Sequence, residues 1–548
     1  MAWYRFGLSH TTDGLGMALG RLPGVTVRGR QVDVHENAAW LVERCCRQAG
    51  VQFSVETLRE DGEPLEGLER LVANGLREWV PGYLTEYQKE GVLGMAHRDG
   101  HFWWAAGSGK TLGAICWALA DPGATVMVTR AGVRRQHGRE IERVTEHRAM
   151  VIESVEDAKG LDDSDALFAV VGYEMLPDLL PWLVGWRPKN LILDEAHRVK
   201  GWQRWQATVM ADGKLRFDPK ENIAQAVYQL SRAVRRRLAT TATPIKDRVR
   251  DLWAQLDLVH PDAWGKFYSK AGASFAERYC DAHMSRWGGI DHGGSSNTDE
   301  LWQRVSFVTH HVPHSVTHRG LPPKRRVVSY VTPAEQCRAD GFTKAFFAKA
   351  SKNGKVGLLE ARLMEAAAKK RKVLLELVEE AVADGQKVVI FTGRREDCDR
   401  LAEEMEEKFK GVDVMSGHGG TSAKERDALV QRYMRHGGPC VLVGTGDAFG
   451  EGISIHDTDL ALIAMLPYTP GALIQWEGRF SRHGQKRPVL VQYLVAEGTV
   501  DEHVVEILLG KLAPVESVAG DDSLTGFAGE LRGEGAEDAI VEGLLARL

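Results

Sequence analysis

The sequence predicts an α/β protein built from two parallel-sheet lobes, with a helical insertion between them and a small N-terminal region before them. Residues 84–260 alternate short apolar runs with helical segments, and residues 385–505 repeat that pattern. Such alternation is typical of buried parallel strands joined by crossover helices. The intervening residues are charged and flank a Gly/Ser-rich loop at 288–297. A chain of 548 residues is also too long for a single hydrophobic core.

The apolar runs locate the individual strands. In the first lobe we expect strands at residues 126–128, 169–171 and 191–193. In the second lobe we expect them at residues 387–391, 441–443, 460–463 and 489–494. The predicted boundaries are 1–80 for an N-terminal accessory region, 81–260 for the first lobe, 261–384 for the insertion and its linker, 385–510 for the second lobe and 511–548 for a C-terminal appendage. No motif assigns a role to residues 1–80.

The composition argues against several classes of protein. Seven cysteines without any C-x-x-C spacing, and 19 histidines without metal-site spacing, argue against a disulfide framework, a structural metal and redox catalysis. A net charge of −5 creates no overall positive field, so any nucleic-acid contact has to be made by local grooves. No apolar run reaches the roughly 20 residues that span a bilayer. Because the N-terminus also lacks the apolar core of a signal peptide, we expect a cytoplasmic protein.

A candidate phosphate loop, A-G-S-G-K-T, occupies residues 106–111 and precedes a helical stretch. Backbone N–H groups that curl around phosphates at a helix N-terminus are expected from Gly107, Ser108 and Gly109. Lys110 would reach the β- and γ-phosphates of ATP, and the Thr111 hydroxyl would ligate Mg²⁺. The strict motif has a glycine where this chain has Trp104, so the loop by itself leaves open a chance glycine-rich turn.

An acidic box, D-E-A-H, directly follows the apolar run at residues 191–193. This placement puts both carboxylates at the C-terminal end of a strand, where open α/β sheets bind ligands. We expect Asp194 to hold hydrated Mg²⁺ and Glu195 to orient and deprotonate the attacking water. Together with the upstream phosphate loop, the box favours an ATP-hydrolysing site over a solvated helix start.

A third element, Q-W-E-G-R-F-S-R-H-G-Q, lies in the second lobe at residues 475–485. Arg479 and Arg482 are three residues apart and would share one face of a helix. From a facing lobe they would stabilise charge on the γ-phosphoryl group, a role worth roughly 10³–10⁵ in rate. The register that begins at Gln475 distinguishes these arginines from ordinary solvated ones.

Together these elements resemble superfamily-two helicases, and among them the Swi/Snf-related DNA translocases, over about residues 82–505. The resemblance implies two RecA-like lobes and ATP with Mg²⁺ as cofactors. It implies catalytic roles for Lys110, Glu195, Gln475, Arg479 and Arg482. Residues 84–92 look like the family's L-x-x-Y-Q-x-x-G-V segment, which makes Gln88 the expected adenine reader. Residues 449–453 resemble the glycine-rich motif before the arginines and place Gly452 at the nucleotide.

Residues 238–245, L-A-T-T-A-T-P-I, look like the family's coupling motif. The Thr241 and Thr243 hydroxyls are expected to hydrogen-bond the acidic box and so to transmit changes at the bound nucleotide to the residues that bind DNA. His197 is the third expected coupling residue. In the insertion, R-Y-C-D-A at 278–282, S-S-N at 295–297 and L-P-P-K at 321–324 resemble the annealing and fork-remodelling subgroup. A basic pair expected before L-P-P-K appears as His310-His311, which is mostly neutral at pH 7.

Residues 128–137 resemble the element that touches the nucleic-acid backbone, although the usual Pro and Trp are absent. The expected phosphate contacts are Arg134, Arg135 and Lys324, with K-K-R-K at 369–372 as a further candidate. For each of these candidates the alternative interpretation is that the charged residues form a solvated helix face. For Trp103 and Trp104, we favour core packing over stacking on the base.

The leading hypothesis is a DNA-dependent ATPase that translocates on duplex or forked DNA without sequence preference and remodels DNA, anneals strands or displaces bound proteins. Alternatives are a strand-separating DNA or RNA helicase, a motor subunit of a restriction or defence complex, and a recruiter with a vestigial ATPase. The expected partners are DNA and replication or recombination proteins. We expect a monomer, associated with the nucleoid of a bacterial or phage-infected cell.

Overall fold

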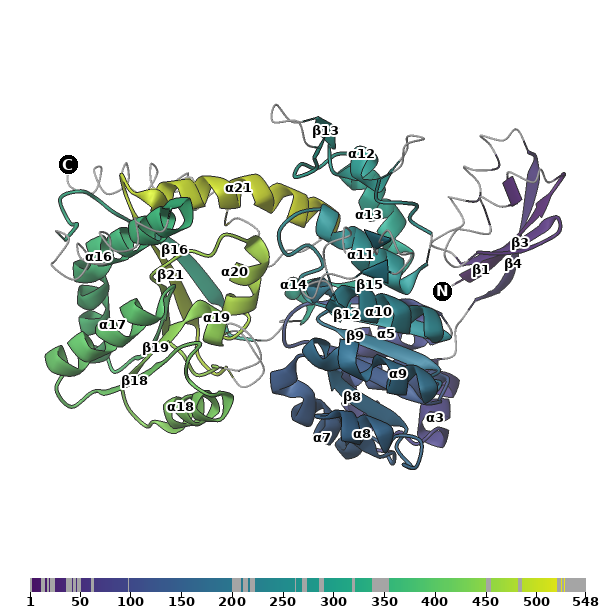
Figure 1. Ribbon diagram of the computed structural model, residues 1–548, viewed down its shortest axis with the longest axis horizontal. Coiled ribbons are helices and arrows are strands. Elements are labelled where there is room, and N and C mark those ends of the chain that lie inside the picture. The colour runs from purple at the N-terminus through teal and green to yellow at the C-terminus, as the bar shows by residue number, and fades with distance from the viewer. Residues whose placement is uncertain are drawn as a thin grey trace. The chain divides into compact units, whose positions relative to one another are not determined.

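The computed structural model describes residues 2–10, 15–16, 19, 25–35, 42, 46, 51–60, 64–96, 98–199, 208–209, 215–216, 222–261, 263–268, 274–284, 290–317, 321–337, 354–449, 455–480, 485–519, 524 and 527. The chain forms two compact units (Figure 1). The first is Met1–Pro313 with Ser517–Gly520, and the second is His314–Glu516 with Asp521–Leu548. No helix among the described residues has the length and apolar character needed to cross a membrane.

The N-terminal region contains an antiparallel sheet that was not predicted from the sequence. Its strands are β1 (Ala2–Leu8), β2 (Val25–Arg28), β3 (Gln31–His35) and β4 (Phe53–Glu60), in the order β2-β3-β1-β4. Phe6, Val32 and Val34 are buried in this sheet. Helix α3 (Pro64–Ala73) and the short helix α4 (Val80–Tyr83) lead from it to the first parallel sheet.

The first unit is centred on a seven-stranded sheet in the order β15-β5-β12-β9-β6-β8-β7. Every neighbouring pair in this sheet is parallel. The strands are β5 (Gly100–Trp104), β6 (Thr125–Thr129), β7 (Ala149–Val151), β8 (Phe168–Gly172), β9 (Asn190–Asp194), β12 (Arg236–Thr241) and β15 (Thr309–Val312). The three strands expected in this lobe are thus present as β6, β8 and β9.

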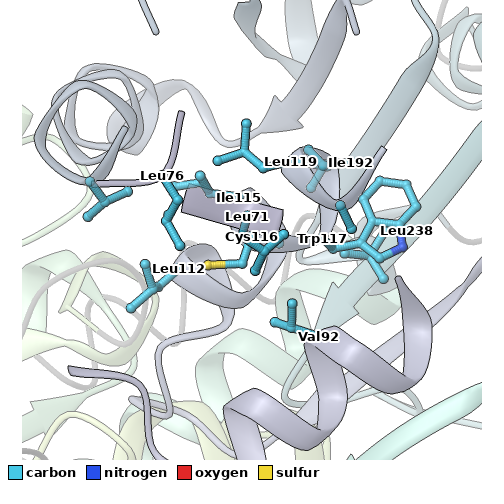
Figure 2. Packing of buried hydrophobic residues seen from close by; sticks show 14 of the residues in the cluster. Leu71, Leu76, Val92, Leu112, Ile115, Cys116, Trp117, Leu119, Ile192 and Leu238 are labelled. Carbon is cyan, nitrogen blue, oxygen red and sulfur yellow. The ribbon is translucent and has the colours of Figure 1, made fainter. Parts of the chain in front are cut away.

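Crossover helices cover this sheet, as a parallel arrangement requires. They are α5 (Glu86–Met95), α6 (Lys110–Ala120), α7 (Arg134–Val144), α8 (Val155–Lys159), α9 (Leu176–Gly185), α10 (Asn222–Ala233) and α11 (Arg250–Val259). Helix α6 is buried along most of its length, and its apolar side chains pack with Leu71, Val92, Ile192 and Leu238 (Figure 2). This packing fixes the helix that follows the candidate phosphate loop.

Strand β5 was missed as a strand because it reads as an aromatic run. Trp103 and Trp104 are both buried, which confirms the expectation that they pack in the core. Trp104 donates a hydrogen bond from Nε1 to His310 Nδ1 at 2.8 Å. A Cβ atom at Gly113 would lie 2.5 Å from the Trp104 ring, and one at Gly91 would lie 2.6 Å from it. The large indole therefore occupies space that two glycines on neighbouring helices leave open.

The second unit contains a six-stranded sheet in the order β16-β21-β20-β17-β19-β18, again parallel throughout. Its strands are β16 (Lys324–Val331), β17 (Lys387–Thr392), β18 (Asp413–Gly417), β19 (Cys440–Thr445), β20 (Leu460–Ile463) and β21 (Val489–Ala496). Its helices are α16 (Gly354–Ala383), α17 (Arg395–Lys408), α18 (Ala423–Arg435), α19 (Gly446–Phe449), α20 (Pro470–Glu477) and α21 (Val500–Ala519). The prediction of an α/β fold with two parallel sheets is confirmed.

The insertion differs from the predicted helical segment between two lobes, because parts of it join each sheet. Strand β15 pairs with β5 at the edge of the first sheet, and β16 pairs with β21 at the edge of the second. Short alternating runs at 309–312 and 324–331 acquire strand structure only when a sheet edge is available. The rest comprises α12 (Phe275–Tyr279), β13 (His283–Met284), β14 (Ile290–Asp291), α13 (Thr298–Ser306) and α14 (His314–Thr317).

The residues that suggested a subgroup form an internal network in the insertion. Arg278 donates two hydrogen bonds to Glu300, at 2.9 and 2.6 Å, and the Tyr279 hydroxyl donates to the same carboxylate at 2.9 Å. Ser296 Oγ and Asn297 Nδ2 donate to the carbonyl oxygen of Arg278, at 2.8 and 2.7 Å. The R-Y-C-D-A and S-S-N segments therefore stabilise each other across the loop that separates them.

The described cysteines are free thiols, and five of the six are buried. Burial raises the pKa of Cys116, Cys280 and Cys398 to about 12 and that of Cys440 to about 11. Such thiols are protonated at neutral pH and are poor nucleophiles. Within the described part of the chain, no group of three or more His, Cys, Asp or Glu side chains could hold a metal ion by itself.

A buried histidine pair predicts that the first unit is sensitive to acid. Neither ring nitrogen of His101 has a hydrogen-bond partner, its ring lies 5.7 Å from that of His260, and burial lowers the pKa of His101 to about 3. Below about pH 6.5, His101 is protonated in the unfolded chain but stays neutral in the folded chain. The free energy of unfolding therefore falls by about 1.4 kcal/mol for each pH unit. We expect His101→Leu to flatten this dependence in denaturant titrations between pH 4 and 7.

The matched control is His283→Leu, because the His283 side chain is exposed to solvent. Its pH profile of stability is expected to follow that of the wild type. An unchanged profile in His101→Leu would show that the acid sensitivity has another origin.

Candidate nucleotide and coupling site

The candidate phosphate loop joins β5 to α6. Gly107 and Gly109 adopt left-handed backbone angles, with φ of 80° and 79°. The positive φ favours glycine at both positions, and a Cβ atom at Gly109 would also lie 2.4 Å from Gln88 Nε2. Lys110 Nζ donates to the carbonyl oxygens of Trp104 and Ala105, each at 3.2 Å, which folds the ammonium back over the loop. The loop thus presents backbone N–H groups, a helix N-terminus and a cation together, the groups that bind phosphate.

Helix α5 holds this loop from one side. The Gln88 side-chain amide and the Tyr87 hydroxyl both donate to the carbonyl oxygen of Ser108, each at 2.9 Å. Gln88 Oε1 in turn accepts from the backbone N–H of Thr85 at 2.8 Å. Gln88 therefore supports the phosphate loop in this structure, and its role as the adenine reader stays a prediction. Tyr87 has this supporting role although the sequence motif gives it none.

Asp194 ends β9 and is fixed by hydroxyl groups from three other elements. Thr129 Oγ1 donates to Oδ2 at 2.9 Å, and Thr240 Oγ1 donates to Oδ1 at 3.0 Å. The Tyr173 hydroxyl donates to the Asp194 carbonyl oxygen at 2.8 Å, and burial raises the pKa of this tyrosine well above its ordinary value. Sequence reasoning missed Thr129 and Thr240 because both lie inside strands, where a threonine needs no functional explanation.

The coupling residues gather around Glu195, whose backbone adopts a left-handed conformation with φ of 52°. Thr241 Oγ1 donates to Glu195 Oε2 at 3.4 Å and lies 3.0 Å from His197 Nδ1. The same His197 nitrogen lies 3.4 Å from Thr243 Oγ1 and 3.3 Å from Glu195 Oε2. The predicted hydrogen bonds between the coupling motif and the acidic box are therefore present. They connect β12 to the loop after β9, and these two strands are neighbours in the sheet.

The residues expected to hold Mg²⁺ lie near one another. Thr111 Oγ1 lies 3.3 Å from His137 Nε2, and this nitrogen lies 3.7 Å from Asp194 Oδ2. A hydroxyl and a carboxylate are oxygen donors of the kind that Mg²⁺ takes, so Thr111 and Asp194 fit the cation. His137, on α7, was not identified as a site residue from the sequence.

In the second unit, the arginine motif begins on α20 and continues beyond its end. Gln475 and Arg479 are both buried, and Arg479 Nε donates to the Gln475 carbonyl oxygen at 3.2 Å. The Arg479 carbonyl oxygen accepts from the backbone N–H of Ile455 at 3.0 Å. The predicted residues Arg482 and Gly452 lie outside the described part of the chain.

The same helix carries a buried carboxylate that binds two cations. Glu477 accepts from Lys324 Nζ at 2.5 Å and from Arg326 at 2.7 and 2.6 Å, and the Tyr493 hydroxyl donates to it as well. Burial alone raises the pKa of Glu477, but the two cations outweigh it and hold the pKa well below its ordinary value. Lys324 therefore lies in an internal ion pair, with its side chain only 7% exposed, and its expected phosphate contact has no support in this arrangement.

We expect Glu477→Gln to destabilise the second unit by about 3–5 kcal/mol, because removing one partner leaves buried charge uncompensated. Chemical denaturation followed by circular dichroism measures this loss. The matched control is Glu379→Gln, since Glu379 pairs with Lys408 at 2.7 Å but is 59% exposed. That exposed pair is expected to contribute less than about 1 kcal/mol. Equal stability of the two variants would contradict an anchoring role for Glu477.

The other predicted phosphate contacts differ in exposure. Arg134 donates to the Ile152 carbonyl oxygen at 2.9 Å, and its side chain is largely buried. Arg135 is 74% exposed and forms a two-point contact with Glu153 at 3.0 and 2.5 Å. Within the K-K-R-K run, Lys370 is buried and pairs with Asp501 at 2.6 Å. Nucleic-acid contact by Arg134 and Arg135 stays a prediction, and of the two only Arg135 presents its cation to solvent.

Two domain families match this chain. The SNF2-related domain matches residues 164–375, and the helicase conserved C-terminal domain matches residues 369–484. The SWI/SNF-related matrix-associated actin-dependent regulator of chromatin subfamily A-like protein 1 of Xenopus tropicalis is 28% identical over 449 residues, which cover 78% of this chain and 44% of that protein. The DNA annealing helicase and endonuclease ZRANB3 of Homo sapiens is 24% identical over 445 residues, which cover 76% of this chain and 39% of that protein. The matches thus span less than half the length of either relative.

Two solved structures are similar to this chain. The SWI2/SNF2 ATPase core of Sulfolobus solfataricus in complex with dsDNA is 20% identical, covers 82% of this chain and 96% of its own, and gives a TM-score of 0.37. The Hef helicase domain of Pyrococcus furiosus is 16% identical, covers 78% of this chain and 98% of its own, and gives a TM-score of 0.44.

Proposed function

We propose, from the matches to the SNF2-related domain and the helicase conserved C-terminal domain, that this chain is a DNA-dependent ATPase that translocates on duplex DNA. ATP hydrolysis would drive it to remodel or anneal DNA structures or to displace bound proteins. One observation carries the proposal. The phosphate loop, the acidic box and the coupling motif follow β5, β9 and β12, which are adjacent in one parallel sheet. Their carboxyl ends meet at a single edge, where such sheets bind ligands.

The residues at this edge have different roles in ATP hydrolysis. Lys110 and the N-terminus of α6 bind the β- and γ-phosphates and neutralise their charge. Mg²⁺, held by Thr111 and Asp194, would offset charge on the phosphate oxygens when bound. Glu195, oriented by Thr241, is placed to take a proton from the attacking water. Arg479 and Arg482 remain the predicted cations for charge on the transferred phosphoryl group.

The coupling network supports the motor part of the proposal. His197 lies within hydrogen-bonding distance of Thr241 and Thr243. A movement of Glu195 during hydrolysis would therefore shift the hydrogen bonds of the loop after β12. A motor needs such a contact, because nucleotide state has to alter the grip on the track. DNA as that track is consistent with the name of one relative, a DNA annealing helicase and endonuclease.

The choice of track is tested by ATPase stimulation. We expect phosphate release to rise at least about tenfold with blunt or forked duplex DNA and to respond weakly to single-stranded DNA or RNA, since a duplex translocase binds the phosphate backbone of both strands. Stimulation by single strands or RNA alone would contradict duplex translocation and favour a strand-separating helicase. A restriction or defence motor would show itself by co-purification with a nuclease chain.

The cellular setting follows from this function as a further proposal. A sequence-tolerant DNA motor would work at the nucleoid of a bacterial or phage-infected cell, as a monomer, beside replication or recombination proteins. Fractionation with and without nuclease treatment tests the DNA association.

A further inference from the structure

Two apolar side chains face solvent on a short two-stranded ribbon in the insertion. Strands β13 and β14 pair antiparallel, and their register sets Met284 directly opposite Ile290. Opposite residues of an antiparallel pair project from the same face of the ribbon, with Cβ atoms about 5 Å apart. Met284 is 70% exposed and Ile290 is 50% exposed. Single exposed apolar residues are ordinary, but two that share one face form a joint apolar surface, which indicates a binding role.

The ribbon is anchored at both of its ends. Before β13, the Asp281 backbone N–H donates to Ser296 Oγ at 3.2 Å. After β14, Arg250 Nη1 lies 3.2 Å from His292 Nε2, and Nδ1 of the same ring lies 2.8 Å from the Tyr268 hydroxyl. A two-stranded ribbon is only marginally stable by itself. These contacts therefore provide the rigidity that the ribbon needs to press an apolar side chain against another molecule.

The base of the ribbon also contacts the segment that follows the coupling motif. The chain leaves this motif, at residues 238–245, and soon reaches Arg248. A Cβ atom at Gly293 would lie 1.7 Å from Arg248 Nη1, so the guanidinium packs directly against the backbone after β14. Gln255 Nε2 donates to the Pro244 carbonyl oxygen at 2.7 Å, which fixes the end of the motif to α11. A movement of the coupling motif during ATP hydrolysis would therefore be transmitted to the ribbon.

Cations lie beside the apolar pair. Arg248 and Arg250 are both partly exposed at the base of the ribbon. The neighbouring carboxylate of Asp291 accepts from the Gly293 backbone N–H at 2.9 Å. This hydrogen bond, aided by the charge of Arg248, holds the pKa of Asp291 below its ordinary value. Arginines that can bind phosphate next to side chains that can insert between bases suit nucleic acid better than an apolar protein surface.

We propose that Met284 and Ile290 form a wedge that inserts between bases at the junction of forked DNA. Methionine and isoleucine are among the side chains that proteins insert between base steps, where they unstack the bases. The inference rests on the proposed DNA translocation and adds to it the element that opens the base pair at the junction. The contact of the ribbon with the segment after the coupling motif links this opening to ATP hydrolysis.

The test uses forked DNA that carries 2-aminopurine at the junction, because this base becomes more fluorescent when it unstacks. The full chain is added until the fork is saturated, as followed by fluorescence anisotropy. We expect the wild type to raise the fluorescence about threefold, and to leave a probe inside the duplex arm unchanged, since a wedge unstacks only the step that it enters. The double variant Met284→Ser with Ile290→Ser is expected to lose the rise at saturation.

The matched control is Val155→Ser with Val184→Ser, which removes exposed apolar side chains from α8 and α9. It is expected to keep the wild-type signal. A bound wild type without a rise at the junction, an equal rise at both probe positions, or a rise that survives in the double variant overturns the wedge but leaves translocation intact. Failure of the wild type to bind the fork and to respond to duplex DNA in ATP hydrolysis overturns the proposed function as well. The comparison of the two probe positions needs no variant.

Discussion

Lys110→Ala is expected to reduce DNA-stimulated ATP hydrolysis by about a hundredfold to a thousandfold, because the loop loses the cation that stabilises charge on the transferred phosphoryl group. The ammonium lies over the loop, bonded to the Trp104 and Ala105 carbonyl oxygens, so its removal leaves the backbone N–H groups in place. Phosphate release, measured with and without duplex DNA, gives the size of the effect. Thermal unfolding of the same variant confirms that the fold is retained.

Lys159→Ala provides the matched control for charge. Lys159 pairs with Glu156 on the partly exposed surface of α8 and belongs to no site motif. Its loss is expected to leave hydrolysis within about twofold of the wild type, as for most surface substitutions. Hydrolysis that persists unchanged in Lys110→Ala would remove the basis for assigning the nucleotide site to this loop.

Glu195→Gln is the second substitution with a large expected effect. The amide keeps the shape of the side chain and its contact with Thr241, but it cannot accept a proton from the attacking water. We expect kcat to fall by about 10²–10⁴, with nucleotide affinity nearly unchanged. Single-turnover hydrolysis and binding of a fluorescent ATP analogue measure the two quantities separately.

The control for this substitution is Glu174→Gln, because Glu174 is a partly exposed carboxylate in the same unit that pairs with Arg198 at 3.3 Å. It is expected to change neither quantity. A Glu195→Gln variant with weakened binding and an unchanged kcat would assign the residue to substrate binding instead of proton transfer.

Much of the nucleotide site was readable from the sequence because its residues lie in short local motifs, one of which directly follows an apolar strand. The acidic box directly follows β9, and the phosphate loop stands between β5 and a buried helix. Parallel strands bring such loops to one edge irrespective of the details of packing. The contact of Thr241 with Glu195 was expected from the resemblance of residues 238–245 to the family's coupling motif, and the structure makes it possible because β12 and β9 are neighbouring strands.

Other features depended on partners far away in the chain. Lys324 was expected to contact phosphate, yet it pairs with Glu477, which lies 153 residues away. The sequence of a run of charged residues is the same whether its cations are exposed to solvent or paired with a buried carboxylate. The edge strands β15 and β16 were missed for a related reason, because a short run becomes a strand only where a sheet edge accepts it.

By itself, the sequence determined two parallel-sheet lobes and the loops that carry the phosphate, acidic and coupling motifs, because these depend on local patterns that recur along the chain. Only the tertiary structure decided which charges are buried and which polar atoms meet. It placed Thr129 and Thr240 on the carboxylate of Asp194, and His137 beside it. Such meetings depend on packing between distant segments, and burial makes their energetic consequences large.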